Sequence, residues 1–388
     1  MTSATQSNSG ASAYIGFLYA MAGNPDILTE ENLADTEVLA QVKRLLGKVN
    51  RGSGSSGWLK SLIVQNPDRF DAMFNYEAMI IEANQELMTK GGDPLCAIYP
   101  ANGIMVADSP LGYVDKGDAN KEELFLKLQE HLLSKPVQEQ LRNLGRRAGL
   151  LGMSVDSANK SVWNPDWCID AERDIAPVPT PAQTVIRQAL DLYQTGLRKP
   201  SLTVWVLDVS GSMGGAGIDG LHQAMHALLD PTTARRNLLQ PSAQDITIVI
   251  PFNHEVRNVW KVEGNDPAEL ADLLAKTQNL EAAGGTDLYR ALVSALEEIR
   301  HYNVDGALQS RLPAIVAMTD GASDTANRDY FLDQLKRSPI ARDIPIHTIS
   351  FGKSDESQLG ELSEMTLGRM FKSKGNLPET LRKAKGYN

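Results

Sequence analysis

The sequence has few cysteines and lacks a long apolar run. Its two cysteines, Cys96 and Cys168, lie in separate segments, which favours two buried or free thiols, although one disulfide is compatible with the spacing. No stretch reaches about 18 consecutive apolar residues, so we expect no transmembrane helix. No basic side chain precedes the first short apolar run, unlike in a signal peptide. We therefore expect either a cytoplasmic protein or a piece whose targeting segment lies outside this sequence.

An excess of positive charge is also missing. The net charge is -10 over 388 residues, and no compensating basic stripe is visible, so a nucleic-acid partner is not expected. Hydrophobic residues make up 42% and charged residues 22%, as in ordinary globular proteins. The length predicts two or three domains, with enough apolar material for two cores.

The sequence is organised around a turn between a buried strand and a helix. The continuous apolar run over 203–207 is typical of a strand that is buried on both faces of a parallel sheet. It leads into Asp208, Ser210 and Ser212, and a helical pattern follows over 217–229. One carboxylate and two hydroxyls at alternating positions are hard oxygen ligands, which suit Mg2+, Mn2+ or Ca2+.

Two later segments place similar side chains at corresponding positions. Gly284-Gly285-Thr286-Asp287 opens a predicted helix over 286–301, and Thr319-Asp320-Gly321 follows a buried run over 314–318. Ligands bind at the carboxyl ends of the strands in open α/β sheets. Each segment alone is explained equally by a turn capped by serine or threonine. The occurrence of all three in order favours one shared site.

These three segments together resemble the metal-ion-dependent adhesion site of von Willebrand factor A domains. The resemblance implies one divalent cation, Mg2+ first and Mn2+ or Ca2+ as alternatives. It also implies a protein partner that offers an Asp or Glu side chain to the cation, which is binding rather than catalysis, so we expect no enzyme activity. The implied ligand positions are Asp208, Ser210, Ser212, Thr286 and Asp320.

Residues 7–150 resemble the later half of a bacterial solute-binding protein of the ABC-transporter class. The segments that carry this resemblance include Ser7-Asn8-Ser9-Gly10, Asn75-Tyr76-Glu77 and Tyr99-Pro100. The first lobe of such proteins does not precede Ser7, so we expect little or no binding of a small solute and a scaffold role instead. The Ser/Gly-rich segments 7–10 and 53–57 precede helices, and either a bound anion or plain helix capping explains them.

The predicted fold class is α/β, with three regions along the chain. We expect a smaller α/β domain that resembles a solute-binding protein over 1–162, a proline-rich connector and helix over 163–199, and a doubly wound, mostly parallel sheet over 200–388. Tryptophans 163 and 167 are expected to pack the connector onto one domain. Further buried strands are expected at 246–250 and 345–350, with an edge strand at 255–261; the other helices are expected at 7–22, 30–49, 120–133, 182–197, 267–277, 326–337, 356–366 and 376–386.

Three functions are compatible with these patterns. The first is a metal-dependent protein-binding module on a solute-binding-like scaffold, which the resemblances place at a bacterial cell surface or in a periplasm. The second is an intracellular adaptor that works with an AAA+ ATPase, another setting in which von Willebrand A domains occur. The third is a metal-dependent hydrolase, which the missing nucleophile and general base disfavour. His222 and His226 have a spacing that can bind zinc, but no motif supplies a third ligand.

Overall fold

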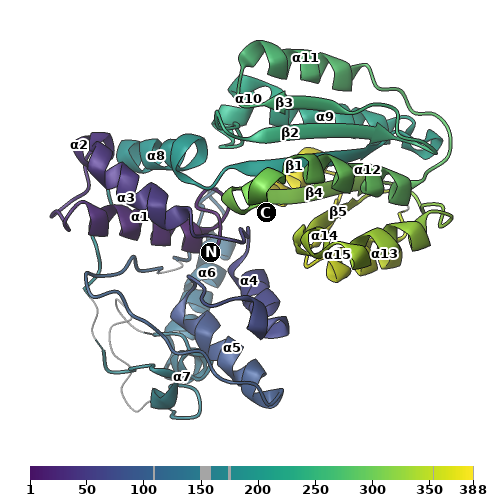
Figure 1. Cartoon of the computed structure of the whole chain (residues 1–388). Helices are drawn as coiled ribbons and strands as arrows, with labels where there is room; N and C mark the ends of the chain where they lie inside the picture. Colours follow the sequence, from purple (N-terminus) through teal and green to yellow (C-terminus); the bar gives the residue numbers. More distant parts are fainter. Residues whose placement is uncertain (108–109, 149–158, 174–175, 353, 388) are drawn as a thin grey trace. The chain divides into compact units, whose positions relative to one another are not determined.

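The computed structural model in Figure 1 describes the chain except for residues 108–109, 149–158, 174–175, 353 and 388. The chain forms two compact units, each made of two segments. The first unit combines Met1–Asn32 with Ser55–Val185, and the second combines Leu33–Gly54 with Ile186–Asn388. None of the described helices is long and apolar enough to cross a membrane.

This division differs from the predicted boundaries at two places. Residues 33–54 belong to the second unit, although the sequence placed them in the first domain. The predicted connector over 163–199 is shared, because the boundary after Val185 falls inside helix α8 (Gln183–Leu192). The predicted helix over 30–49 is two helices in the structure, because Asp35 accepts hydrogen bonds from the backbone N–H groups of Glu37 and Val38 and starts a new helix there.

The first unit is helical in the part of the chain that the structure describes. Its helices are α1 (Asn8–Met21), α4 (Ser56–Gln65), α5 (Glu77–Thr89), α6 (Ala119–Leu133) and α7 (Lys135–Asn143), with α2 (Glu30–Ala34) at its boundary and single 3-10 turns at Pro67–Arg69 and Pro165–Trp167. The prediction of an α/β domain is wrong for these described residues, since every strand of the sheet lies in the second unit.

A single backbone bridge joins two extended segments in the described part of residues 98–182. Ile104 and Pro177 form an isolated parallel bridge, in which Val178 donates its backbone N–H to the carbonyl oxygen of Ile104 at 2.9 Å. Prolines at 177, 179 and 181 lack the N–H groups that a longer ladder needs. The likeness of this unit to a solute-binding protein stays a prediction, and Asp108 and Ser109 lie outside the described residues.

The two cysteines form a disulfide, so the expectation of two separate thiols is wrong. Cys96 and Cys168 lie 72 residues apart in sequence, but their Cα atoms are 5.1 Å apart. The backbone segments next to the two cysteines are also hydrogen-bonded to each other, since Ala97 donates its N–H to the carbonyl oxygen of Trp167 at 2.9 Å. Trp163 and Trp167 pack in a buried cluster with Ile81, as predicted for the connector. Sequence spacing alone could not show this long-range pairing.

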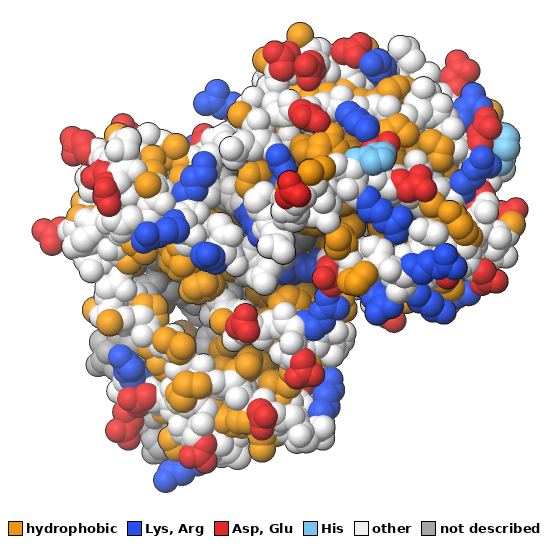
Figure 2. Space-filling view, in the orientation of Figure 1, with side chains coloured by type: hydrophobic (Ala, Val, Ile, Leu, Met, Phe, Trp, Pro, Cys, Tyr) orange, Lys and Arg blue, Asp and Glu red, His pale blue; other side chains and the backbone are white. Residues whose placement is uncertain are grey.

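Large apolar side chains are exposed along residues 98–144 of the first unit. Helix α6 has no buried residue, and Leu124 and Leu133 on it are 68% and 69% exposed. Figure 2 shows hydrophobic side chains among the surface atoms of this unit. The described contacts of α6 therefore leave much of its apolar surface in contact with solvent.

The second unit contains a six-stranded sheet in the described residues. Its order is β3-β2-β1-β4-β5-β6, and all neighbouring pairs are parallel except β2 with the edge strand β3. This confirms the predicted mostly parallel α/β sheet. The strands are β1 (Ser201–Asp208), β2 (Ile246–Phe252), β3 (Trp260–Glu263), β4 (Leu312–Thr319), β5 (Ile346–Ser350) and β6 (Met370–Lys372).

The edge strands depart from the sequence prediction. The edge strand begins at Trp260 rather than Glu255, because Asn253 and Glu255 pair their own backbone groups in a turn that follows β2. Strand β6 was not predicted, since its three residues are too few for a pattern to be recognised.

Helices cover both faces of this sheet. Helix α12 (Leu288–His301) lies over β1 and β4 in Figure 1, where alternate β1 residues, Leu202, Val204 and Val206, share its buried cluster. The other helices of the unit are α3 (Thr36–Leu46), the π-helical turn η4 (Tyr193–Leu197), α9 (Ala216–Leu229), α10 (Pro231–Arg236), α11 (Pro267–Gln278), α13 (Arg328–Arg337), α14 (Pro339–Asp343), α15 (Glu356–Met365) and α16 (Leu377–Ala384), with 3-10 turns at Gly211–Met213 and Val304–Ser310. Both sheet faces are buried, which explains the continuous apolar runs of the central strands.

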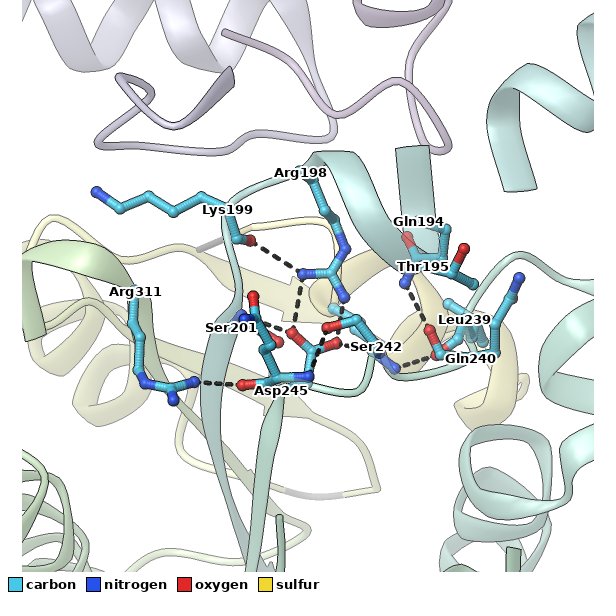
Figure 3. Close-up of polar contacts among 12 residues, drawn as sticks. Gln194, Thr195, Arg198, Lys199, Ser201, Leu239, Gln240, Ser242, Asp245 and Arg311 are labelled. Atoms are coloured by element: carbon cyan, nitrogen blue, oxygen red, sulfur yellow. Dashed lines mark hydrogen bonds and ion pairs between the residues drawn. The ribbon is translucent and has the colours of Figure 1, made fainter. Parts of the chain in front are cut away.

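The amino-terminal end of the sheet is closed by a buried carboxylate. Asp245 directly precedes β2 and is 2% exposed. It accepts hydrogen bonds from the backbone N–H groups of Ser201 and Ser242, both at 2.7 Å, and forms an ion pair with Arg198 (Figure 3). Burial acts to raise the pKa of Asp245, but the charge and hydrogen bonds of Arg198 together with the two N–H groups lower it.

Candidate metal site

The register of the sheet places four strand ends in one row at its carboxyl-terminal edge. Asp208, the last residue of β1, pairs with Phe252, the last residue of β2. On the other side, Thr319 at the end of β4 pairs with Ser350 at the end of β5. The hydroxyl of Thr319 donates to Oδ2 of Asp208 at 2.5 Å, which joins the two pairs. The two predicted carboxylate ligands, Asp208 and Asp320, therefore lie at the ends of two adjacent central strands.

Four of the predicted ligands lie in a continuous chain of contacts. The buried carboxylate of Asp208 accepts a hydrogen bond from the backbone N–H of Ser210 at 2.7 Å. The hydroxyl oxygens of Ser210 and Ser212 are 3.1 Å apart, and Ser212 donates to Oδ1 of Asp320 at 2.7 Å. Residues more than 100 positions apart in sequence thus bring their oxygen atoms to one place.

The fifth predicted ligand, Thr286, is carried by a loop that lies against the first one. Gly211, between the two serines, donates its N–H to the carbonyl oxygen of Gly284 at 2.9 Å. The carbonyl oxygen of Thr286 accepts from the backbone N–H of Asp324 at 2.8 Å, just beyond Asp320. These contacts fix the backbone of Thr286 between the other two loops, and the use of its hydroxyl as a ligand stays a prediction.

Several residues that hold these loops were not among the predicted site residues. Thr319 is fully buried and accepts from the N–H of Gly321 at 3.2 Å while it bonds Asp208. Its place beside Asp320 in the sequence could have suggested this role. Asn253 is 4% exposed; its side-chain N–H donates to the carbonyl oxygen of Ala283, and its own carbonyl oxygen accepts from Asp287, both at 2.8 Å. No sequence pattern marked Asn253.

A buried serine connects the second and third loops. The hydroxyl of Ser323 accepts from the backbone N–H of Leu288 at 2.8 Å, at the first turn of α12. The N–H of Ser323 donates to Oε1 of Gln358 on α15 at 3.0 Å. The loop that carries Asp320 is thereby tied to two helices, which limits how far this carboxylate can move.

The electrostatics of the site follow from two carboxylates that share one region. Burial raises the pKa of Asp208, hydrogen bonds from Thr319 and Ser210 lower it, and the charge of Asp320 raises it further. Among the described residues, no group of three or more His, Cys, Asp or Glu side chains has a metal-binding arrangement. The donor set is therefore carboxylate and hydroxyl oxygen, which fits a hard divalent cation such as Mg2+.

The hydroxyl-rich segments of the first unit also come together. The hydroxyl oxygens of Ser9 and Ser56, near the starts of α1 and α4, are 2.9 Å apart. Ser9 also contacts the hydroxyls of Thr2 at 2.7 Å and Ser7 at 3.0 Å. Ser55 caps α4 by accepting from the N–H of Trp58 at 3.3 Å, as the capping interpretation expected, whereas Ser7 at the start of α1 makes no side-chain capping bond. These uncharged side chains are hydrogen-bonded to one another or to the helix.

A family model of known proteins matches the part of the chain that contains the sheet. Residues 204–381 match the family model of the von Willebrand factor type A domain, and this range includes all five predicted ligands. The family model therefore supports a von Willebrand factor type A domain over these residues, which make up less than half of the chain.

Curated relatives match this part of the chain. Calcium-activated chloride channel regulator 1 from Homo sapiens is 32% identical over 180 residues, which cover 46% of this chain and 17% of that protein. Inter-alpha-trypsin inhibitor heavy chain H3 from Mus musculus is 26% identical over 159 residues, which cover 40% of this chain and 17% of that protein. The chain thus spans only about a sixth of the length of these relatives.

Solved structures also match part of the chain. A von Willebrand factor type A protein from Catenulispora acidiphila has a TM-score of 0.41 and 16% identity, with 50% of this chain and 43% of that chain covered. Proximal thread matrix protein 1 from the mussel byssus, with a zinc-occupied metal-ion-dependent adhesion site, has a TM-score of 0.34 and 13% identity, with 53% of each chain covered.

Proposed function

We propose that this chain is a metal-dependent protein-binding module. Asp208, Ser210, Ser212, Thr286 and Asp320 would hold one divalent cation, most readily Mg2+, at the carboxyl-terminal edge of the sheet. The observation that carries this proposal is the contact chain from Asp208 through the two serine hydroxyls to Asp320. The von Willebrand factor type A match supports a protein-interaction role.

The charges of the donor set explain why an acidic partner would bind. Asp208 and Asp320 supply two negative charges, and the hydroxyls add only dipoles. When bound, a divalent cation would offer its remaining coordination position to a carboxylate oxygen of an Asp or Glu on the partner. Ser212 is exposed whereas Asp208 and Ser210 are buried, so the partner would approach from the side of Ser212. No bond is made or broken, and the module is not an enzyme.

The first unit would act as a scaffold or a second interaction surface. Its Ser9–Ser56 hydroxyl cluster has no charged member and is bonded internally, so we expect little or no affinity for a small solute. The disulfide between Cys96 and Cys168 supports a location in an oxidising compartment, outside the cytoplasm.

Calorimetric titration with MgCl2 or MnCl2 tests the metal site. We expect one ion per chain for the unmodified protein and at least about a hundredfold weaker binding for Asp208→Ala, because the cation loses a charged ligand. Asp266→Ala is the matched control: this exposed aspartate caps α11 by accepting from the N–H groups of Ala268 and Glu269. Equal metal binding by Asp208→Ala and the control would overturn the assignment.

A further inference from the structure

The two proposed carboxylate ligands come from central strands, and a different side chain flanks them on each side. Asp208 ends β1 and Asp320 follows β4, whereas β2 lies beyond β1 and β5 lies beyond β4. The second residue after β2 is His254, and the first residue after β5 is Phe351. The row of strand ends therefore places an imidazole on one side of the metal site and an aromatic ring on the other.

His254 lies against the loops that carry the ligands. It is exposed, and a Cβ atom added at Gly284 would be only 2.8 Å from its Nδ1. The carbonyl oxygen of Gly284 accepts from Gly211, which stands between the two serine ligands. The imidazole therefore contacts the loop that packs directly on the loop of Ser210 and Ser212, and the residue is exposed to solvent.

Phe351 occupies the opposite side and is partly exposed. A Cβ atom added at Gly217, in the first turn of α9, would be 3.5 Å from Cε2 of its ring. The next residue, Gly352, approaches the site itself, since a Cβ atom there would be 3.2 Å from Cβ of Asp320. The ring therefore lies beside the start of α9 and adjacent in sequence to the residue that contacts a metal ligand.

We propose that His254 and Phe351 select the residues that flank the acidic side chain of the partner. Neighbouring strands are about 4.8 Å apart, so a cation held between β1 and β4 would lie about 7 Å from each flanking strand. An extended peptide advances about 3.3 Å per residue and turns every second side chain to the same side. The side chains two positions before and after the acidic residue would thus reach His254 and Phe351.

The chemistry of each flank defines the preferred sequence. The imidazole can donate a hydrogen bond, so it favours an acceptor such as Asp. The ring of Phe351 favours an apolar side chain such as Leu, which would lose contact with water there. The preferred segment is acceptor-x-Glu-x-apolar in one chain direction or the other. This inference rests on the proposed function, because it assumes that a carboxylate binds the cation.

Three capped peptides and the Mg2+-loaded full chain test the inference by calorimetry. The probes are Asp-Gly-Glu-Gly-Leu, its reverse Leu-Gly-Glu-Gly-Asp, and Gly-Gly-Glu-Gly-Gly. We expect one of the first two to bind about tenfold more tightly than the glycine peptide. His254→Ala and Phe351→Ala should each remove at least about threefold of this preference, whereas Phe351→Leu should retain it because leucine keeps an apolar surface.

The controls lie at the far end of α12, whose 14 residues extend about 20 Å away from the site. His301→Ala removes an exposed imidazole and Val304→Ala an exposed apolar side chain, and both should keep the preference. Equal binding of the three peptides, or no binding of any, by metal-loaded protein would overturn the inference. Loss of Mg2+ affinity in His254→Ala or Phe351→Ala would also overturn it, since the residue would then hold the site. Failure of the unmodified chain to bind Mg2+ would instead overturn the proposed function.

Discussion

The two ends of the same sheet each bury an aspartate, and the two carboxylates are stabilised differently. Asp245, at the amino-terminal end, has the guanidinium of Arg198 as its counter-ion (Figure 3). Asp208, at the carboxyl-terminal end, accepts hydrogen bonds from Thr319 and Ser210 and experiences the negative charge of Asp320. Arg198 and the two N–H groups outweigh burial and lower the pKa of Asp245, whereas burial, with a smaller contribution from Asp320, raises the pKa of Asp208.

This difference separates a structural carboxylate from one that is suited to bind an external cation. A buried charge is tolerated when a counter-charge and hydrogen bonds replace its hydration. The chain supplies that counter-charge to Asp245 through its own arginine. Asp208 instead contacts two hydrogen-bond donors and lies near a second negative charge, so a bound divalent cation would supply the positive counter-charge. The sheet thus has one end whose buried carboxylate has a counter-ion within the chain, and one end where, as proposed above, a bound cation would supply it.

The largest effect is expected where the internal ion pair is broken. Asp245→Asn should lower the free energy of unfolding by about 3 kcal/mol, because Arg198 would keep its charge with only 10% of its side chain exposed and no counter-ion from residue 245. Urea unfolding measures this loss. Asp272→Asn is the control, since the ion pair of Asp272 with Lys276 is exposed and should contribute less than about 0.5 kcal/mol. Similar losses in the two variants would contradict the role assigned to Asp245.

The sequence predicted the central strands of the sheet and the loops that carry Asp208 and Asp320, because both depend on local patterns. The apolar runs at 203–207 and 314–318 lie within β1 and β4, and the motif residues Asp208 and Asp320 follow from where those strands end. The parallel pairing of β1 with β4 then brings the two carboxylates to the same edge. Periodicity and strand ends were therefore sufficient for the centre of the second unit.

The parts that were not predicted depend on contacts between distant segments. Nothing near Asp245 in the sequence identifies Arg198 as its partner, and nothing near Asn253 shows that it holds the loop of Thr286. The disulfide joins residues 72 positions apart. The placement of 33–54 in the second unit likewise depends on which core its helix packs against. Each of these features is set by tertiary structure, for which one sequence gives no pattern.

Addition of Mg2+ should raise the free energy of unfolding only when the carboxylate of Asp208 is present to bind the cation. At a free Mg2+ concentration of about 100 times Kd, the unmodified chain should gain about 2.7 kcal/mol in the free energy of unfolding. Asp208→Asn should gain at most about 0.4 kcal/mol, since at least hundredfold weaker binding brings this concentration to no more than its Kd. In chelating buffer this variant should be at least as stable as the unmodified chain, because the charge that it removes is buried beside Asp320. Urea unfolding with and without Mg2+ checks both statements, and an equal gain in the variant would contradict them.

Acid should reduce the contribution of Asp245 to the free energy of unfolding. The pKa of Asp245 lies below its ordinary value of 3.8 in the folded state, so its contribution to stability is complete above that value and is lost as the pH falls through the folded pKa. The difference in unfolding free energy between the unmodified chain and Asp245→Asn should therefore shrink below about pH 4, by at most about 1.4 kcal/mol per pH unit. Unfolding at pH 7, 4 and 3 measures it, and a constant difference would contradict this account.

The smallest effect is expected from one methyl group placed next to the metal site. Gly352 has φ +62°, and a Cβ atom there would be 3.2 Å from Cβ of Asp320. Gly352→Ala should push on Asp320 and weaken Mg2+ binding about tenfold, and the strained backbone should cost about 1 kcal/mol of stability. Gly375→Ala separates these two effects, because Gly375 has φ +87° but no atom within 4 Å of the added methyl group. It should lose similar stability and keep its metal affinity, because its added methyl group meets no part of the proposed metal site. Equal Mg2+ affinities in the two alanine variants would show that the carboxylate tolerates displacement, and the geometry of Asp320 would then not limit binding.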